Sequence, residues 1–215
     1  MKKLPGILSL AFLLAACSPT SEVTPQLVTV YSSQAAAPWL SGLYGCAGDS
    51  GAALALTDRS SAQIVLQIGE PETLTTPAFE IDSEEILIVT GRESPVRNLT
   101  LDEARALFSG QGDPSVQVWV YPSDADVQRA FDRVVMSGRS VSSLARLAAG
   151  PQQMSDVVNA ESNAVGILPR HWKAGDARDV YAFGPVPVLA ITQSEPALPG
   201  PSAGVIRTLI ACLQK

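Results

Sequence analysis

Short apolar runs alternate with longer amphipathic segments along most of the chain. Runs rich in β-branched residues are typical of buried strands, whereas an apolar residue at every third or fourth position is typical of helices. Strands are predicted at 27–31, 53–57, 64–68, 86–90, 116–121, 164–168 and 186–192. Helices are predicted at 35–44, from 98 to about 110, from 122 onward, and at 141–149, 151–160 and 203–214. This order of elements predicts an α/β fold in which helices cover a sheet.

Three helix starts carry local signals of their own. Thr100 and Glu103 have the spacing of a capping box, in which each side chain satisfies a backbone N–H group of the other residue. The hydroxyls of segment 32–34 (SSQ) are suited to cap the helix at 35–44, and Ser123 is suited to cap the helix after Pro122.

The first 17 residues have the features of an export signal. Residues 1–3 (MKK) are positively charged, and the apolar stretch 7–16 is too short to cross a bilayer. The stretch ends in 14–17 (LAAC), which resembles the bacterial lipobox. The resemblance implies a signal peptide at 1–16, a lipidated Cys17, a tether at 17–26, and an extracytoplasmic lipoprotein anchored to a membrane of the cell envelope. The alternative is a plain secretory peptide with an incidental cysteine.

The net charge of the chain disfavours some classes of binding partner. Removing residues 1–16 takes away two lysines and leaves 13 basic against 21 acidic side chains. Nucleic acids and anionic lipids need basic patches, so both are disfavoured as partners, and the acyl group is the expected membrane contact. About 200 residues suffice for one large domain or two small lobes.

Two cysteines remain after Cys17. Exported proteins meet oxidising conditions, so Cys46 and Cys212 are expected to form a disulfide; the alternative is two buried free thiols. Neither cysteine has metal-ligand spacing to His171, so no metal site is predicted.

The stretch 46–54 (CAGDSGAAL) resembles the nucleophile segment of trypsin-like serine proteases. A serine nucleophile needs a base, and His171, the one histidine of the chain, comes after Ser50 without a G-x-S-x-G elbow. Glycine, aspartate and serine are also turn residues, so a turn between a helix and a strand is the preferred interpretation. No enzyme activity and no cofactor are therefore predicted.

One segment carries a family resemblance. Residues 88–110 (IVTGRESPVRNLTLDEARALFSG) resemble the hinge and first second-lobe helix of type II periplasmic substrate-binding proteins, in particular the phosphate-binding branch that serves ABC transporters. Segment 162–168 (SNAVGIL) is similar to a later strand of that family. The resemblance covers most of 27–215, and residues 86–183 are its most specific part.

The resemblance implies a two-lobed periplasmic-binding-protein-like fold of type II, reduced in size. Lobe I would comprise 27–87 and 185–215, and lobe II 88–184. The helices that carry Cys46 and Cys212 then lie in the same lobe, which supports the disulfide. The implied function is a lipid-anchored, monomeric solute-binding protein that captures a small polar solute or anion between its lobes and delivers it to an ABC permease.

The chain departs from that family where an anion would bind. Phosphate binders have a Gly-Ser-Gly-Thr stretch at a second-lobe helix N-terminus, but here the aligned stretch is 123–126 (SDAD). Two carboxylates suit helix capping and would repel phosphate, so phosphate is a weaker candidate than the resemblance suggests. This departure keeps open a second function, an envelope lipoprotein that uses the fold for protein interaction or sensing.

The candidate ligand residues are taken from three loops. They lie at the end of the first strand, in the loop after 53–57, and at the aligned helix start: Ser32, Ser33, Arg59, Ser123 and Asp124. Each of these residues also has a possible structural role: the serines are suited to cap helices, and Arg59 is suited to form an ion pair within its loop. His171 and Trp172 would lie either at the cleft or in a surface turn.

Overall fold

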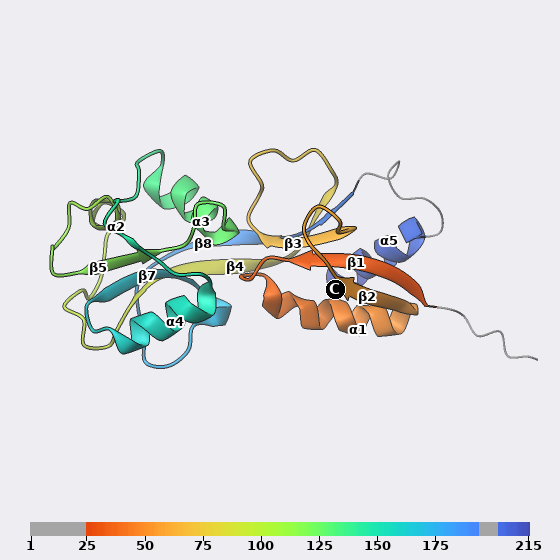
Figure 1. Ribbon diagram of the computed structural model, residues 1–215, viewed down its shortest axis with the longest axis horizontal. Helices are drawn as coiled ribbons and strands as arrows, with labels where there is room; N and C mark the ends of the chain where they lie inside the picture. Colours follow the sequence, from red (N-terminus) through yellow and green to blue (C-terminus); the bar gives the residue numbers. More distant parts are fainter. Residues whose placement is uncertain (1–24, 194–201) are drawn as a thin grey trace, which may run out of the picture.

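The computed structural model describes residues 25–193 and 202–215. It contains an eight-stranded sheet with the strand order β2-β1-β3-β8-β4-β7-β5-β6 (Figure 1). The strands are β1 Gln26–Ser32, β2 Ala52–Leu56, β3 Ile64–Ile68, β4 Ala78–Thr90, β5 Gln117–Val120, β6 Arg146–Leu147, β7 Ala164–Pro169 and β8 Arg178–Thr192. The helices are α1 Leu40–Ser50, α2 Leu101–Phe108, α3 Asp126–Phe131, α4 Pro151–Ala160 and α5 Ser202–Leu213. Three short helical turns are η1 Ala37–Trp39, η2 Asp132–Met136 and η3 Arg170–Trp172.

Two long strands join the two halves of the molecule. β4 and β8 pair in antiparallel fashion from Ala78 opposite Ile191 to Thr90 opposite Arg178. We call the half with β1–β3, α1 and α5 lobe I, and the half with α2, β5, α3, β6, α4 and β7 lobe II; they lie at the right and left of Figure 1. Three register shifts interrupt the β4–β8 pairing, and such bulges bend and twist a sheet. The predicted lobe boundaries at 87/88 and 184/185 fall inside these two strands, and we keep them as a proposal.

One continuous buried apolar cluster extends through both lobes. In lobe I, α1 and α5 pack against each other, and Val28 and Val30 of β1 are fully buried. The predicted disulfide between Cys46 of α1 and Cys212 of α5 is present. In lobe II, the ring of Phe131 lies 4.7 Å from that of Phe108, with both side chains fully buried. The α/β fold predicted from the pattern is thus confirmed.

The capping box at the start of α2 is also confirmed. The hydroxyl of Thr100 accepts a hydrogen bond from the Glu103 N–H at 3.3 Å, and the Glu103 carboxylate accepts one from the Thr100 N–H at 2.7 Å. The hydrogen bond from the Thr100 backbone lowers the pKa of Glu103. This helix start is therefore specified by a four-residue stretch of sequence.

The helix predicted at 141–149 is wrong. The segment is irregular and contributes the short strand β6, which pairs in parallel with β5. Its backbone bonds to distant segments: the Ser142 N–H donates to the Phe108 carbonyl, and the Ala148 N–H donates to the Val120 carbonyl. Leu144 is 83% exposed, so the apolar residues that suggested a helix face do not form a buried stripe.

The turn predicted around Ser50 is the last turn of a helix instead. α1 begins at Leu40 and runs to Ser50, beyond the predicted end at residue 44, and Gly51 ends it in the left-handed conformation (φ 66°). Glycine adopts this conformation without steric cost, which makes it a common helix terminator. The Ser50 hydroxyl donates to the Cys46 carbonyl at 2.9 Å.

Only half of each long strand was predicted. β4 begins at Ala78 and β8 at Arg178, whereas the apolar pattern indicated 86–90 and 186–192. The missed half of β4 (78–85, AFEIDSEE) is largely polar, and the missed half of β8 (178–185, RDVYAFGP) ends in Gly184 and Pro185, residues that disfavour a strand interior. They are strands because β4 and β8 pair with each other along their length.

No helix among residues 25–193 and 202–215 is long and apolar enough to cross a membrane.

Candidate functional site

The candidate site lies at the junction of the lobes, where the ends of β1 and β3 face α3. At its centre, Oδ2 of Asp126 accepts two hydrogen bonds from lobe I. The Ser33 hydroxyl donates one at 2.5 Å, and the Ile68 backbone N–H donates the other at 2.8 Å. Asp126 is 6% exposed and Ser33 9%. A carboxylate of lobe II is therefore buried against hydrogen-bond donors of lobe I.

The donors of lobe I are oriented by lobe I itself. The Ser33 N–H donates to the Leu66 carbonyl at 2.9 Å, and the Ser33 hydroxyl accepts from the Ala36 N–H at 3.1 Å. Ile68 is held in β3, opposite Val188 of β8. These bonds fix the positions of the hydroxyl and the amide without any group from lobe II.

The acceptor is positioned by the start of α3. Asp126 is the first residue of this helix, and its other oxygen, Oδ1, accepts from the Val127 N–H at 2.9 Å. The carboxylate thus receives three hydrogen bonds, which offset the cost of burying its charge. Burial, together with the negative charge of Asp126, raises the pKa of Tyr121 well above its usual value.

Further contacts close the junction around this centre. Gln34 of lobe I lies against Gly150, where an added Cβ would come within 1.8 Å of the Gln34 amide oxygen. The Trp172 indole N–H of lobe II donates to the Ala35 carbonyl of lobe I at 3.0 Å. A side chain at position 150 would displace the end of the Gln34 side chain from this part of the junction.

A second contact group sits at the bend of β4. The ring of His171 in η3 lies 4.6 Å from the ring of Trp39 in η1, and its Nδ1 lies 2.7 Å from Oε2 of Glu84. Glu84 is 2% exposed. His171 lies in the turn η3 with 49% of its side chain exposed, as the surface-turn alternative predicts, and it also contacts Trp39 of the other lobe. The Ser50 hydroxyl donates to carbonyls of its own helix, so Ser50 and His171 do not form a nucleophile–base pair.

The structure places the five predicted ligand residues in different surroundings. Ser33 lies at the junction, and Ser32 next to it donates to the Ser33 carbonyl at 2.9 Å. Ser123 is exposed and does not cap α3, whose N-cap is Ala125 without a side-chain cap. Asp124 is exposed, and its carbonyl accepts from Arg129.

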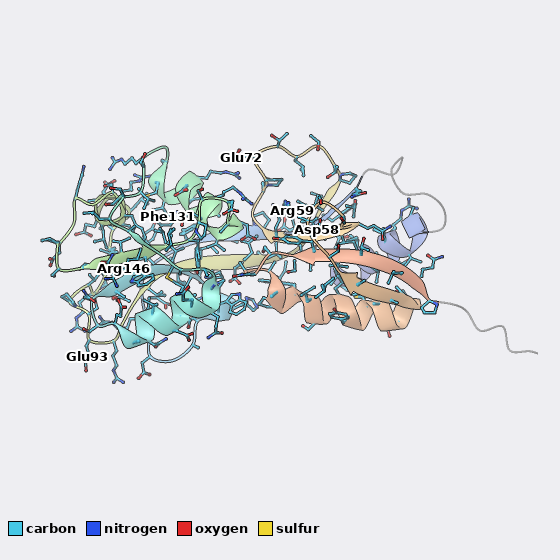
Figure 2. All side chains as sticks on the ribbon, in the orientation of Figure 1. Asp58, Arg59, Glu72, Glu93, Phe131 and Arg146 are labelled. Carbon is cyan, nitrogen blue, oxygen red and sulfur yellow. A yellow bond between two sulfur atoms is a disulfide. The ribbon has the colours of Figure 1, made fainter. Side chains whose placement is uncertain are left out.

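Arg59 lies on the other side of β3 from α1, as Figure 2 shows for the labelled residues Asp58 and Arg59. Its guanidinium donates to Oε1 of Gln67 at 2.5 Å and lies 5.7 Å above the ring of Tyr31. Hydrogen bonds from the Ser60 side chain and the Ser61 backbone lower the pKa of Asp58. Arg59 therefore adjoins the site through Gln67, the residue before Ile68, and does not contact Asp126.

Sequence reasoning missed Asp126, the residue at the centre of the junction. The segment 123–126 was identified as the position of an anion-binding stretch, but an aspartate in a first helical turn has the appearance of a capping residue. The sequence did contain a signal, because carboxylates stand at the two positions where the family's stretch has hydroxyl groups. Among the described residues, no group of three or more His, Cys, Asp and Glu side chains is arranged to hold a metal ion.

Comparisons with known proteins agree on the fold. No protein-family model matches the chain, and no curated protein matches it. Among solved structures, a putative phosphate ABC transporter substrate-binding protein with bound phosphate from Clostridium perfringens is 13% identical, with a TM-score of 0.72 over 86% of this chain and 93% of that one. An ABC-type phosphate transport receptor from Vibrio cholerae is 16% identical, with a TM-score of 0.65 over 87% and 93%.

A regulatory protein has a similar architecture. The regulatory domain of CcmR from Synechocystis PCC6803, in complex with 2-PG, is 11% identical, with a TM-score of 0.64 over 88% of this chain and 98% of that one. The same fold thus occurs in transport receptors and in regulatory domains. The chain has the type II periplasmic-binding-protein-like fold that residues 88–110 predict.

Proposed function

We propose that this chain is an extracytoplasmic solute-binding protein of the kind that serves ABC importers, and that it captures a small polar solute between its lobes. The observation that carries this proposal is the architecture, in which two lobes joined by β4 and β8 meet at a junction with polar groups from both sides. Two transport receptors with this fold, which are named for phosphate, support it.

The mechanism requires no chemical step. In the part of the chain that the structure describes, β4 and β8 are the strands that run through both lobes, so a change at their bulges can alter the angle between the lobes. A solute that contacts both lobes stabilises the closed arrangement by the difference between its affinities for the closed and open states. A permease that recognises the closed arrangement then receives the loaded protein.

The proposal includes a lipid anchor. Cys17 lies outside the described residues, and its lipidation rests on the lipobox resemblance of 14–17. An acylated Cys17 followed by a tether up to residue 26 would hold a monomer near its permease. Mass spectrometry of the membrane fraction tests this part, because a Cys17→Ser variant should lose both the acyl mass and the membrane association.

A thermal-shift screen tests solute binding. The protein without residues 1–17 is screened against sugars, polyols, amino acids, polyamines, phosphate and sulfate, with the disulfide oxidised. A solute at 100 times its dissociation constant adds about 2.7 kcal/mol to the free energy of unfolding, which raises the Tm by several degrees. The shift should be reduced in Ser33→Ala and kept in Asp124→Ala, whose side chain is exposed. The absence of a shift with every class would contradict the proposal.

One observation favours a second candidate function. Groups of the chain itself already fill the junction, because Asp126 satisfies the lobe I donors and Gln34 fits against Gly150. A protein whose lobes close without a solute would suit an envelope module that binds another protein. This candidate predicts no solute-dependent shift and no loss of uptake when the gene is deleted.

A further inference from the structure

We infer that the carboxylate of Asp126 is a built-in ligand, which occupies the anion position of lobe I, holds the lobes together without a solute, and excludes free oxyanions. The inference deepens the proposed function by restricting the class of solute. The part of the inference that concerns the solute class rests on the proposed function. The part that concerns the closed junction does not, since that junction is formed by the chain alone.

The first step is the geometry of the bound oxygen. One carboxylate oxygen accepts a hydroxyl donor at 2.5 Å and an amide donor at 2.8 Å. Oxyanions such as formate, acetate, phosphate and sulfate present the same kind of acceptor, and charged acceptors form shorter and stronger hydrogen bonds than neutral ones. Ser33 and Ile68 are therefore bound to an anion that belongs to the protein.

The second step is that the donors do not depend on this anion for their position. Ser33 is held by Leu66 and Ala36, and Ile68 is held by its strand pairing. The donor pair should therefore persist when the carboxylate is removed, and its N–H and O–H groups would then need another acceptor. A buried donor without an acceptor is costly, so a free anion of suitable size should bind there.

The third step is competition. Asp126 is linked to the site by the chain, so it competes with a free anion at an effective concentration on the order of millimolar or higher. An anion that entered beside the carboxylate would also meet like-charge repulsion at short range. Both effects act against phosphate, sulfate and carboxylates.

The same carboxylate selects a different class of solute. When the lobes open, Asp126 offers an acceptor with a negative charge, and Ser33 offers a hydroxyl that can donate or accept. A solute with N–H or O–H donors, and without an anionic group at this position, satisfies both. The geometry thus points to an amine or a polyhydroxylated solute.

Removal of the carboxylate and its replacement by a free anion test the inference. The Tm values of wild type, Asp126→Ala and Asp124→Ala are measured with formate, acetate, phosphate or sulfate, against chloride at equal ionic strength. Asp124 is the matched control, because it lies two residues away and its side chain is exposed. Asp126→Ala should have the lowest Tm, and formate or acetate should raise it by several degrees while leaving the other two proteins unchanged. Equal shifts in all three proteins, or no shift in Asp126→Ala, would overturn the inference.

Solution scattering tests the closed junction directly. Wild type should have the same radius of gyration with and without formate. Asp126→Ala should be more extended and should return to the wild-type value in formate. An unchanged radius in Asp126→Ala would show that the carboxylate does not hold the lobes together.

A conservative variant covers the case in which Asp126→Ala does not fold. Asp126→Asn keeps the size and one oxygen acceptor but removes the charge, so phosphate or sulfate should bind it more tightly than wild type by at least tenfold. Equal anion affinities of the two proteins would overturn the inference.

The two proposals can fail separately. If wild type binds no solute and Asp126→Ala is rescued by formate, the transport function is wrong and the built-in ligand stands. If wild type binds phosphate, the built-in ligand is wrong and solute binding stands.

Discussion

Lobe I and lobe II meet at one junction but contribute opposite chemistry to it. At Asp126, lobe I supplies the donors, a serine hydroxyl and a backbone amide, and lobe II supplies the acceptor, the carboxylate. The direction is reversed beside it, where the Trp172 indole N–H of lobe II donates to the Ala35 carbonyl of lobe I. In a binding protein for anions both lobes would supply donors, and the solute would supply the acceptor. The difference indicates that lobe II has taken over the role of an anionic solute.

The lobes also differ in how they are stabilised. Lobe I has a disulfide between its two helices, α1 and α5. The core of lobe II includes the ring of Phe131, which lies 4.7 Å from Phe108 and 6.1 Å from Phe183. We therefore expect reduction to affect lobe I and core truncation to affect lobe II, and the following predictions test this contrast.

Reduction of Cys46–Cys212 should have the largest effect. The bridge joins cysteines 166 residues apart, and the loop entropy that such a bridge removes from the unfolded chain corresponds to about 5 kcal/mol. Urea unfolding with and without a reducing agent measures the loss. Hydrogen exchange should accelerate in α1 and α5 before it accelerates in β5 and β7; the reverse order would contradict the assignment of the bridge to lobe I stability.

Truncation of Phe131 should come next. Its side chain is fully buried among the aromatic residues of lobe II, and Phe→Ala in a core costs about 3–5 kcal/mol through lost burial and the cavity that remains. Val134→Ala, in the following turn η2 and 47% exposed, is the control and should change the free energy of unfolding by less than about 1 kcal/mol. Similar losses in both variants would argue against an aromatic core in this lobe.

Loss of the Ser33 hydroxyl should have an intermediate effect. Ser33→Ala removes one donor from the buried carboxylate of Asp126, and a hydrogen bond to a charged group contributes about 1.5–3 kcal/mol. Ser32→Ala is the matched control, because that hydroxyl contacts only the neighbouring carbonyl at 2.9 Å. Chemical denaturation of the two variants gives the comparison, and equal losses would mean that Ser33 has no special role at the junction.

Loss of the cap on α2 should have the smallest effect. Thr100→Ala removes the hydroxyl that accepts from the Glu103 N–H, and the loss of such a cap costs about 1 kcal/mol. The folded-state pKa of Glu103 is lowered, so its contribution to stability is present above the unfolded-state pKa and is lost as the pH falls through the folded-state value. An NMR titration should find a higher pKa for Glu103 in the variant; an unchanged pKa would show that the Thr100 side chain does not contribute.

Local sequence determined much of this protein. The apolar runs at 64–68 and 164–168 are strands because their burial in a sheet is favourable, and Thr100 with Glu103 starts α2 through contacts three residues apart. The segment 88–110 indicated the two-lobed fold. The strands and the helix start depend on neighbours along the chain, whereas the two-lobed fold was inferred from the resemblance of 88–110 to a known family.

The tertiary structure alone decided the features that depend on distant partners. The first halves of β4 and β8 are strands because they pair with other parts of these two long strands, and 141–149 is irregular because its backbone groups bond to α2 and β5. Ser33 and Asp126 are 93 positions apart, and either alone has the pattern of a capping residue. Their meeting depends on the packing of two lobes, because local sequence specifies which groups can form hydrogen bonds but not which distant groups they reach.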